Sequence, residues 1–293
     1  MKKYTALVAL ALVAMGCEKE NIDNTPVVED GVMRIEALHP STRATETSFE
    51  NGDVIGLYAT TYEGEAALPL QISGNWINNE VLTYDGSSWA GRRTFYWADG
   101  LMNVYGYYPY MTPSSIDKYK WTVQTDQSTP ATEGALSAYE ASDFLWAKTE
   151  GVSKEDGSVQ LQFKHMCSKV VIKLIKGEKY TDAFPEDIDV YLYSTVPEAL
   201  INFTTGIVSK DPHGTKQKIK ARKVAIDTFE VIVVPQSILE YSPFVEIIMG
   251  KIAYMTEEIF TYHAGKEYVV SITLDNSPQK IEINVGGSVG GWE

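Results

Sequence analysis

The stretch 158–177, SVQLQFKHMCSKVVIKLIKG, changes the face that it buries halfway along. Apolar or neutral residues occupy the odd positions from 159 to 167 and the even positions from 170 to 174. Side chains alternate between the two faces of a strand, so the face toward the core must switch near Ser168. Either the chain leaves one core and enters another there, or a bulge bends a single sheet. The first interpretation predicts a domain boundary at this point.

Runs rich in Val, Tyr, Thr and Trp lie on both sides of this stretch, and most of them alternate with a period of two. Before it come VMRIEAL (32–38), VIGLYATTY (54–62), RRTFYW (92–97), NVYGYY (103–108) and KYKWTVQT (118–125). After it come DIDVYLYS (187–194), TFEVIVVPQ (228–236), PFVEIIMGKIAYMT (243–256), EIFTYHAGKEYVVSITL (258–274) and KIEINVG (280–286). Such runs predict β-strands.

Neither half alternates strands with helical patterns, which argues against a parallel α/β fold. Asp85-Gly86 predicts a hairpin turn because both residues tolerate a positive φ. The segment 126–147 has no period-two pattern, so we expect a long loop with at most a short helix around 135–141. We therefore predict an all-β protein of two antiparallel β-sandwich domains, 32–167 and 168–293.

The N-terminal run LVALALVAMGCEKE (7–20) predicts an export signal. It is too short to span a bilayer, and it follows Lys2 and Lys3. Its end resembles the lipobox of bacterial lipoproteins, in which the cysteine is acylated and becomes the new N-terminus. We expect residues 1–16 to be the signal peptide, Cys17 to carry the lipid, and residues 17–31 to form a flexible tether.

The net charge and the number of cysteines limit the possible partners and disulfide bonds. A formal net charge of −14 disfavours nucleic acid or an anionic membrane surface as a partner. The chain has two cysteines, and assigning Cys17 to the lipid leaves Cys167 without a disulfide partner.

Catalytic and metal-binding patterns are weak. The four histidines are scattered, and no HExxH, GxSxG or Walker-type motif occurs. His165 and Cys167 share a strand face, but their apolar register favours core positions over a nucleophile or metal pair. Asp187 and Asp189 share a face without the spacing of a calcium loop. We predict no enzyme activity, no cofactor and no metal.

The aromatic concentration at 95–110, FYWADGLMNVYGYYPY, allows two interpretations. Exposed Tyr and Trp side chains stack on sugars, whereas inward ones fill a sandwich core. The alternation places several of them inward, so the core interpretation is favoured. A glycan-binding surface lipoprotein is the alternative.

Motifs in one order along nearly the whole chain resemble the fimbrillins, which build type V pili on Gram-negative gut and oral anaerobes. They are the lipobox at Cys17, TRATETSFENGDVIGLYA (42–59), WINNEVLTYDGSSW (76–89), FYWADGLMNVYGYYPY (95–110), DQST (126–129), DFLWA (143–147), LQFKHMCSKVVIKL (161–174), VVPQS (233–237) and GKEYVVSITL (265–274). The resemblance implies two transthyretin-like β-sandwich domains and a pilus subunit, stalk or tip.

The resemblance also implies how such a subunit assembles. Fimbrillin precursors reach the surface as outer-membrane lipoproteins, where an Arg-specific protease removes an N-terminal strand and frees a groove for a strand of a neighbouring subunit. Arg43, followed by Ala44, matches the processing position. The displaced strand would be VMRIEAL, whose Met33, Ile35 and Ala37 share one face. In the donor strand KIEINVG the corresponding residues are Ile281, Ile283 and Val285.

The expected partners follow from this scheme. They are other fimbrillin subunits, the outer membrane through the lipid before processing, the surface protease, and host or bacterial surface ligands, and they do not include nucleic acid. A pilus anchor or accessory protein that keeps its lipid is the alternative within the same class.

Overall fold

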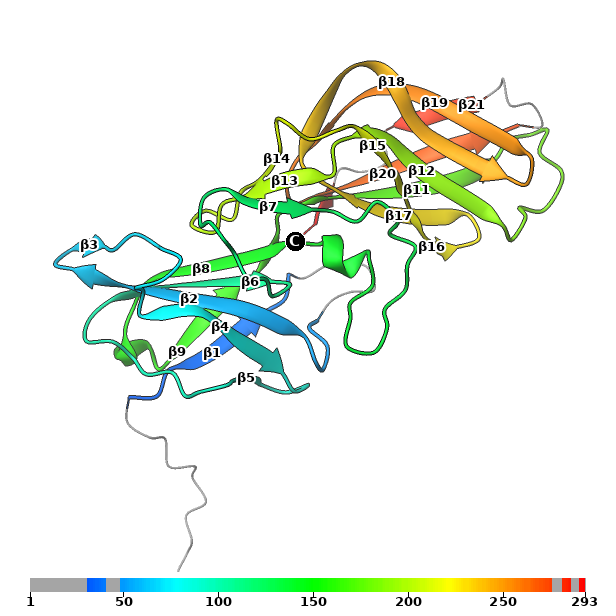
Figure 1. The fold of residues 1–293 in the computed structure, drawn as a ribbon. Helices are drawn as coiled ribbons and strands as arrows, with labels where there is room; N and C mark the ends of the chain where they lie inside the picture. Colours follow the sequence, from blue (N-terminus) through cyan, green and yellow to red (C-terminus); the bar gives the residue numbers. More distant parts are fainter. Residues whose placement is uncertain (1–30, 41–47, 276–280, 286–289, 293) are drawn as a thin grey trace, which may run out of the picture. The chain divides into compact units, whose positions relative to one another are not determined.

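Strands make up nearly all of the regular structure. The computed structural model describes residues 31–40, 48–275, 281–285 and 290–292. Within these residues, helix is limited to two 3-10 turns, η1 (Glu140–Ser142) and η2 (Lys154–Asp156). The described part contains no helix that is long and apolar enough to cross a membrane. The chain is therefore all-β, as predicted, and Figure 1 shows its strands.

The strands before residue 168, apart from β7, form one large sheet and one small one. The large sheet has the order β10-β8-β6-β2-β4-β5, with β3 paired to β2, and the small one pairs β1 with β9. Their bounds are β1 (Arg34–Leu38), β2 (Val54–Glu63), β3 (Ala66–Ala67), β4 (Ile77–Tyr84), β5 (Trp89–Gly91), β6 (Met102–Tyr108), β7 (Tyr119–Thr122), β8 (Leu145–Val152), β9 (Ser158–Gln162) and β10 (Lys164–His165).

The later strands form two further sheets, β16-β17-β11-β20-β21, with β22 paired to β20, and β15-β12-β18-β19. A third sheet, β14-β13-β7, joins strands from both sides of residue 168. The bounds are β11 (Ser168–Lys176), β12 (Ile188–Thr195), β13 (Glu198–Ile201), β14 (Val208–Lys210), β15 (Gln217–Lys220), β16 (Arg222–Ala225), β17 (Thr228–Val233), β18 (Gln236–Met249), β19 (Ile252–Tyr262), β20 (Lys266–Leu274), β21 (Ile281–Val285) and β22 (Gly290–Gly291).

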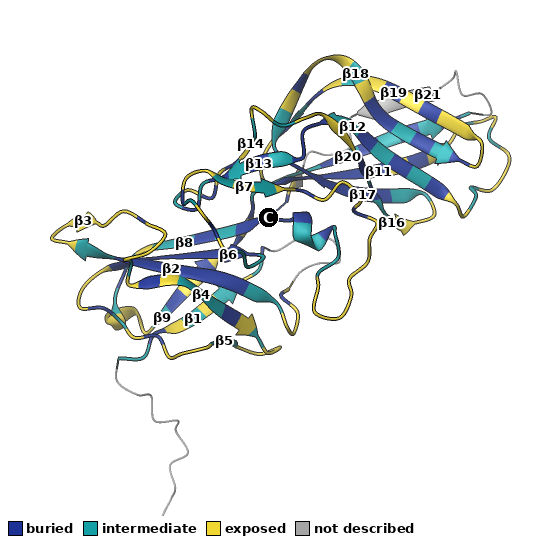
Figure 2. Cartoon of the chain, in the orientation of Figure 1, coloured by how far each residue is buried: buried dark blue, intermediate teal, exposed yellow. Residues whose placement is uncertain are grey.

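Burial follows the alternation of the sequence in most strands, as the colours of Figure 2 show. The central strands β2, β11 and β17 contain runs of consecutive buried residues, and in β6 every residue is buried. Strand β6 lies between β2 and β8, and Gly56 on β2 is paired with Tyr107. A Cβ at Gly56 would lie 2.2 Å from the Tyr107 ring, so glycine is required for this ring to occupy its place against β2.

The hairpin predicted at Asp85-Gly86 is confirmed. Strands β4 and β5 pair across it, and Gly86 has a φ of +93°. The backbone N–H groups of Ser87 and Ser88 donate to the Asp85 carboxylate at 2.8 and 2.7 Å. Hydrogen bonds from Ser88 and Ser87 lower the pKa of Asp85 to about 2, so the turn is held by an ionised side chain.

Three of the expected strands were wrong in detail. The run 258–274 contains the end of one strand and the whole of the next, because β19 ends at Tyr262 and β20 begins at Lys266. Residues 92–97 form no strand, and only an isolated bridge joins Tyr96 to Val32. The run 243–256 is not one strand either, because β18 ends at Met249 and β19 begins at Ile252. Gly250, with a φ of +59°, makes this tight turn, so apolar residues continue across a hairpin.

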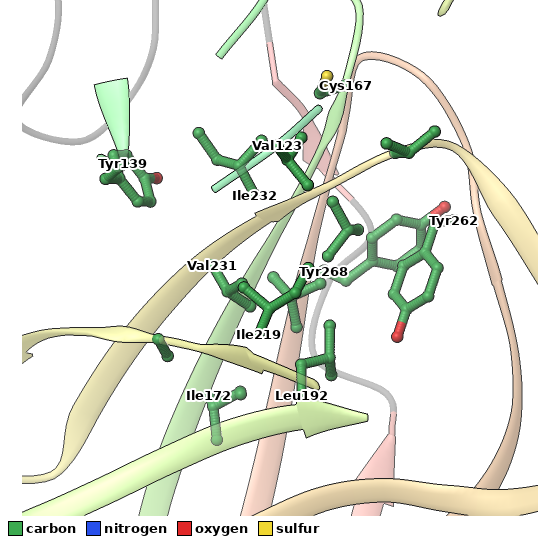
Figure 3. Close-up of a cluster of buried hydrophobic side chains, with 14 of the residues drawn as sticks. Val123, Tyr139, Cys167, Ile172, Leu192, Ile219, Val231, Ile232, Tyr262 and Tyr268 are labelled. Carbon is green, nitrogen blue, oxygen red and sulfur yellow. The ribbon is translucent and has the colours of Figure 1, made fainter. Parts of the chain in front are cut away.

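Buried hydrophobic side chains form two clusters. The first core draws on residues 33 to 163, and the second core contains most of the buried side chains from Cys167 onward. Figure 3 shows part of the second core around Ile172, Leu192 and Ile219. The second core also takes side chains from earlier in the chain, namely Tyr58, Leu70, Tyr105, Tyr107, Ile116, Val123, Tyr139 and Phe144.

The stretch 158–177 changes cores as well as faces. Its odd positions from Val159 to Phe163 are buried in the first core, whereas Cys167 and the even positions from Val170 to Leu174 are buried in the second. Strand β9 belongs to the small sheet with β1, and β11 belongs to the sheet with β17 and β20. The switch near Ser168 therefore takes the chain from one sheet and one core to another.

Candidate functional site

Strand β1 lies beside a groove of about 740 Å³. One wall of the groove is β1 with the residues just before it, and the other is the hairpin β4-β5 with the segment that follows. The opposite wall is made of apolar, aromatic and small polar residues and one arginine, namely Leu82, Tyr84, Ser87, Ser88, Trp89, Ala90, Gly91, Arg93, Thr94 and Phe95. The groove is thus open along the side of β1 that faces β5.

The backbone of β1 is held mainly along its other side. It pairs with β9 in parallel, with Ile35 opposite Val159 and Ala37 opposite Leu161. The Phe163 N–H donates to the Leu38 carbonyl at 3.0 Å, which extends the pairing past the end of β9. Figure 1 shows β1 and β9 side by side.

A short antiparallel contact fixes the start of the strand. The Met33 N–H donates to the Phe95 carbonyl at 2.9 Å, and the Trp97 N–H donates to the Gly31 carbonyl at 3.0 Å. Strand β1 is therefore bound at its start on one side and along its length on the other. Apart from this start, its groove-facing side is the edge of a two-stranded sheet.

The side chains of β1 alternate as the sequence predicts. Met33 is buried, and Ile35 and Ala37 are partly buried against the first core. Arg34 is exposed, and Leu38 is 47% exposed. One face of this strand therefore covers the core with Met33, Ile35 and Ala37, while the other faces solvent.

The residues of β9 beside β1, with Phe163 just after them, are among the most buried of the first core. Val159, Leu161 and Phe163 are at most 1% exposed. Removal of β1 would uncover this apolar surface together with the backbone edge of β9. An uncovered core beside an unpaired edge is the surface that an added strand satisfies through main-chain hydrogen bonds and alternate side chains.

The predicted donor strand is a strand of its own chain's sheet in this structure. Strand β21 pairs antiparallel with β20, with Ile283 opposite Ile272 and Val285 opposite Val270. It is the last strand in the order β16-β17-β11-β20-β21, so it occupies a sheet edge. The segment 281–285 is therefore paired before any exchange with a neighbour.

His165 and Cys167 are core residues, as favoured by their register. His165 is 4% exposed, and its Nδ1 lies 2.8 Å from the Asp143 carboxylate. Cys167 is fully buried and free, and burial raises the pKa of its thiol. The thiol therefore stays protonated and does not act as a nucleophile.

A ring cluster around His165 was missed by the sequence reasoning. The Trp292 ring stacks on His165 with centroids 3.8 Å apart and planes at 9°, and the His39 ring meets His165 edge-on at 5.9 Å. Burial lowers the pKa of His39, although a hydrogen bond to the Pro40 carbonyl opposes the shift, so His39 packs as a neutral ring near pH 7. The one signal in the sequence was a tryptophan within a glycine-rich tail.

The structure also describes the acidic pair Asp187 and Asp189 and the aromatic run 95–110. Asp189 pairs with Lys220 at 2.8 Å, and Asp187 is exposed. No group of three or more metal-ligating side chains occurs among the residues that the structure describes. Most aromatic side chains of 95–110 are buried, including Phe95, Tyr105, Tyr107 and Tyr108. Cys17, Arg43 and Ala44 lie outside the described residues.

Known proteins resemble this chain over most of its length. The Fimbrillin-like family (Mfa_like_1) matches residues 42–292. A proposed fimbrium tip subunit, Fim1C, from Bacteroides ovatus is 30% identical over 205 residues, which cover 59% of this chain and 36% of that protein. The match thus spans about a third of that relative. A proposed fimbrium subunit, Fim1C, from Bacteroides uniformis is 28% identical over 229 residues, covering 75% of this chain and 71% of that protein.

Solved structures share the fold. The crystal structure of a proposed cell adhesion protein from Bacteroides uniformis matches with a TM-score of 0.69 and 22% identity, covering 91% of this chain and 100% of that chain. The tip fimbrial protein Mfa3 from Porphyromonas gingivalis matches with a TM-score of 0.51 and 9% identity, covering 83% and 95%. Because the family match extends from residue 42 to residue 292, the chain belongs to the Fimbrillin-like family.

Proposed function

We propose that this protein is a stalk or tip subunit of a cell-surface pilus and assembles by donor-strand exchange after cleavage at Arg43. Its family and its fimbrial relatives make it a fimbrial or adhesion protein rather than an enzyme. The observation that carries the assembly mechanism is the position of β1. It covers the first core, pairs with β9, and ends at Leu38, five residues before Arg43.

The groove supplies the acceptor in this mechanism. Cleavage after Arg43 would detach β1 from the rest of the chain, leaving it held only by its noncovalent contacts. Strand addition from a neighbour would then recover the hydrogen bonds along β9 and the apolar contacts over Val159 and Leu161. The open side of β1 gives an incoming strand a place to begin this replacement.

The C-terminal segment supplies the donor. Ile281, Ile283 and Val285 alternate with polar residues, as Met33, Ile35 and Ala37 do in the strand to be replaced. Strand β21 lies at a sheet edge, so its departure would break pairing with one neighbour, β20. Edge strands are the elements that sheets lose at lowest cost.

We also propose that the two cores mark two transthyretin-like sandwich domains, divided at residues 167 and 168. Two separate clusters of buried side chains support this division, because Phe163 belongs to the first core and Cys167 to the second. The sheet β14-β13-β7 would then contain strands of both domains.

The central experiment uses the purified chain and an Arg-specific protease. We expect cleavage to convert the monomer into a ladder of polymers on gels of non-boiled samples, because each freed groove accepts a strand from another copy or from an added subunit. A chain that is cleaved completely at Arg43 yet stays monomeric, alone and with other fimbrillin subunits, would contradict the proposal.

Lipid attachment at Cys17 is the expected route to the surface. The Cys17→Ala precursor should lose its partition into detergent and its association with the outer membrane, because the acyl chains that hold it there are absent. Detergent phase separation of cell fractions measures this directly. Normal partition and surface exposure of Cys17→Ala would rule out the anchor while leaving the fold unaffected.

A further inference from the structure

Trp292 is buried although it follows a segment that contains four glycines between residues 286 and 291. Its side chain is 4% exposed, and its backbone N–H donates to the Gly265 carbonyl at 3.0 Å. The two residues before it, Gly290 and Gly291, pair with the beginning of β20. The C-terminal segment is thus attached to β20 at two places, with β21 at one and Trp292 beside the other.

The indole lies in a socket built by residues of the first half of the chain. The His165 ring stacks parallel to it at 3.8 Å, and Asp143 holds that ring through its Nδ1 at 2.8 Å. Both His165 and Asp143 are buried, so the stacked face of the indole is shielded from water. A flat aromatic contact on a ring that is itself held by a buried hydrogen bond is a specific attachment point rather than a chance surface contact.

A third residue of this cluster comes from the N-terminal segment. His39 directly follows β1, and its ring packs edge-on against His165 at 5.9 Å and against Phe49 at 4.9 Å. The Phe163 N–H, two residues before His165, donates to the Leu38 carbonyl. The segment at the end of β1 therefore supports His165 through His39 and Leu38. Trp292, near the other end of the chain, stacks on the same ring.

We propose that Trp292 and its socket form a latch that keeps the C-terminal segment on its own β20 until the N-terminal segment carrying His39 is removed. The socket is complete in the unprocessed chain. Cleavage at Arg43 takes away His39 and the backbone contact at Leu38, which loosens His165 and so weakens the stack on Trp292. The latch rests on the proposed function, because it makes donor release depend on processing.

The latch would solve a problem of timing. A donor strand that is free before processing could pair with exposed sheet edges during export, which is the hazard of any unpaired strand. Tying its release to loss of β1 makes the same cleavage open the acceptor groove and free the donor. Each subunit would thus become competent at both ends in one step.

Hydrogen exchange of the full-length, unprocessed chain tests the latch. In Trp292→Ala, the amides of 281–285 should exchange roughly tenfold faster than in the wild type, because an aromatic contact that closes the segment is lost. In His39→Ala the same amides should exchange about threefold faster, since His165 loses one supporting ring but keeps its stack on Trp292. Removal of the segment up to Arg43 by protease should also make the amides of 281–285 exchange faster, because it removes His39.

Two matched variants control for loss of a ring elsewhere. Trp76→Ala removes a tryptophan that is 47% exposed, and His213→Ala removes an exposed turn histidine. Both should leave the exchange of 281–285 unchanged. Amides of the buried strand β6 report on global unfolding, so the ratio of the two regions isolates local opening even where a variant is less stable. Trp292→Phe should restore most of the protection.

The results also separate the latch from the assembly mechanism. Unchanged exchange of 281–285 in Trp292→Ala would show that the indole does not hold the segment. Faster exchange in Trp292→Ala, but not in His39→Ala or after N-terminal removal, would disprove the dependence on processing. If exchange behaves as expected but cleaved chains form no polymer, the latch stands and donor-strand exchange fails.

Discussion

Arg43→Ala is expected to abolish polymer formation and leave the full-length lipoprotein on the membrane. Without cleavage, β1 stays covalently attached beside β9, where it competes with any incoming strand at a very high effective concentration. The edge of β9 and the side chains of Val159 and Leu161 therefore stay covered. Immunoblots of membrane fractions and ladders of non-boiled samples measure both effects.

A second arginine provides the control for this variant. Arg34 is exposed, but its backbone lies within β1 and is paired with Ser158. A protease needs an extended segment that it can take into its active site, which a paired strand does not offer. Arg34→Ala should therefore be processed and polymerise normally. Normal processing of Arg43→Ala, or loss of processing in Arg34→Ala, would show that the cleavage site has been misassigned.

Ile283→Asp is expected to fold as a monomer and fail to extend a chain. In the proposed polymer, Ile283 fills an apolar groove, and burial of such a side chain contributes about 1.5–3 kcal/mol. An aspartate there would lose this contribution and bring an unpaired carboxylate into the groove, which costs more still. Since each 1.4 kcal/mol is about a factor of ten in an equilibrium constant, polymers of this variant should be absent from ladders of cleaved protein.

The neighbouring position gives a matched control. Glu282 alternates with Ile283 and so belongs to the opposite face of the strand. Glu282→Gln should polymerise nearly normally and retain the wild-type thermal unfolding transition before cleavage. Equal ladders for Ile283→Asp and wild type would contradict exchange through this segment. Loss of the folded monomer in Ile283→Asp would show that β21 is needed by its own sheet.

The alternation of apolar and polar residues predicted the strands that have one buried face and one exposed face. The side chains of β1 and the change of core near Ser168 follow from periods that can be read directly. The turn at Asp85-Gly86 was equally clear, because both residues have a strong local preference. These features depend on interactions between residues close in sequence.

Features that depend on distant residues were not predicted. The segment 92–97 has strand-like composition but pairs through a single bridge, between Tyr96 and Val32, so composition alone overestimated it. Apolar residues on both sides of Gly250 concealed a hairpin. The stack of Trp292 on His165 brings together residues with no shared periodicity, and only the fold places them in contact.

The most direct test of the account is the N-terminus of the subunit within the assembled pilus. Polymers sheared from the cell surface can be dissociated and their subunits analysed by N-terminal sequencing and intact mass. The account predicts that assembled subunits begin at Ala44 and carry no lipid. Assembled subunits that begin at an acylated Cys17 and retain β1 would contradict it, because the proposed acceptor groove would then still be filled by the subunit's own strand.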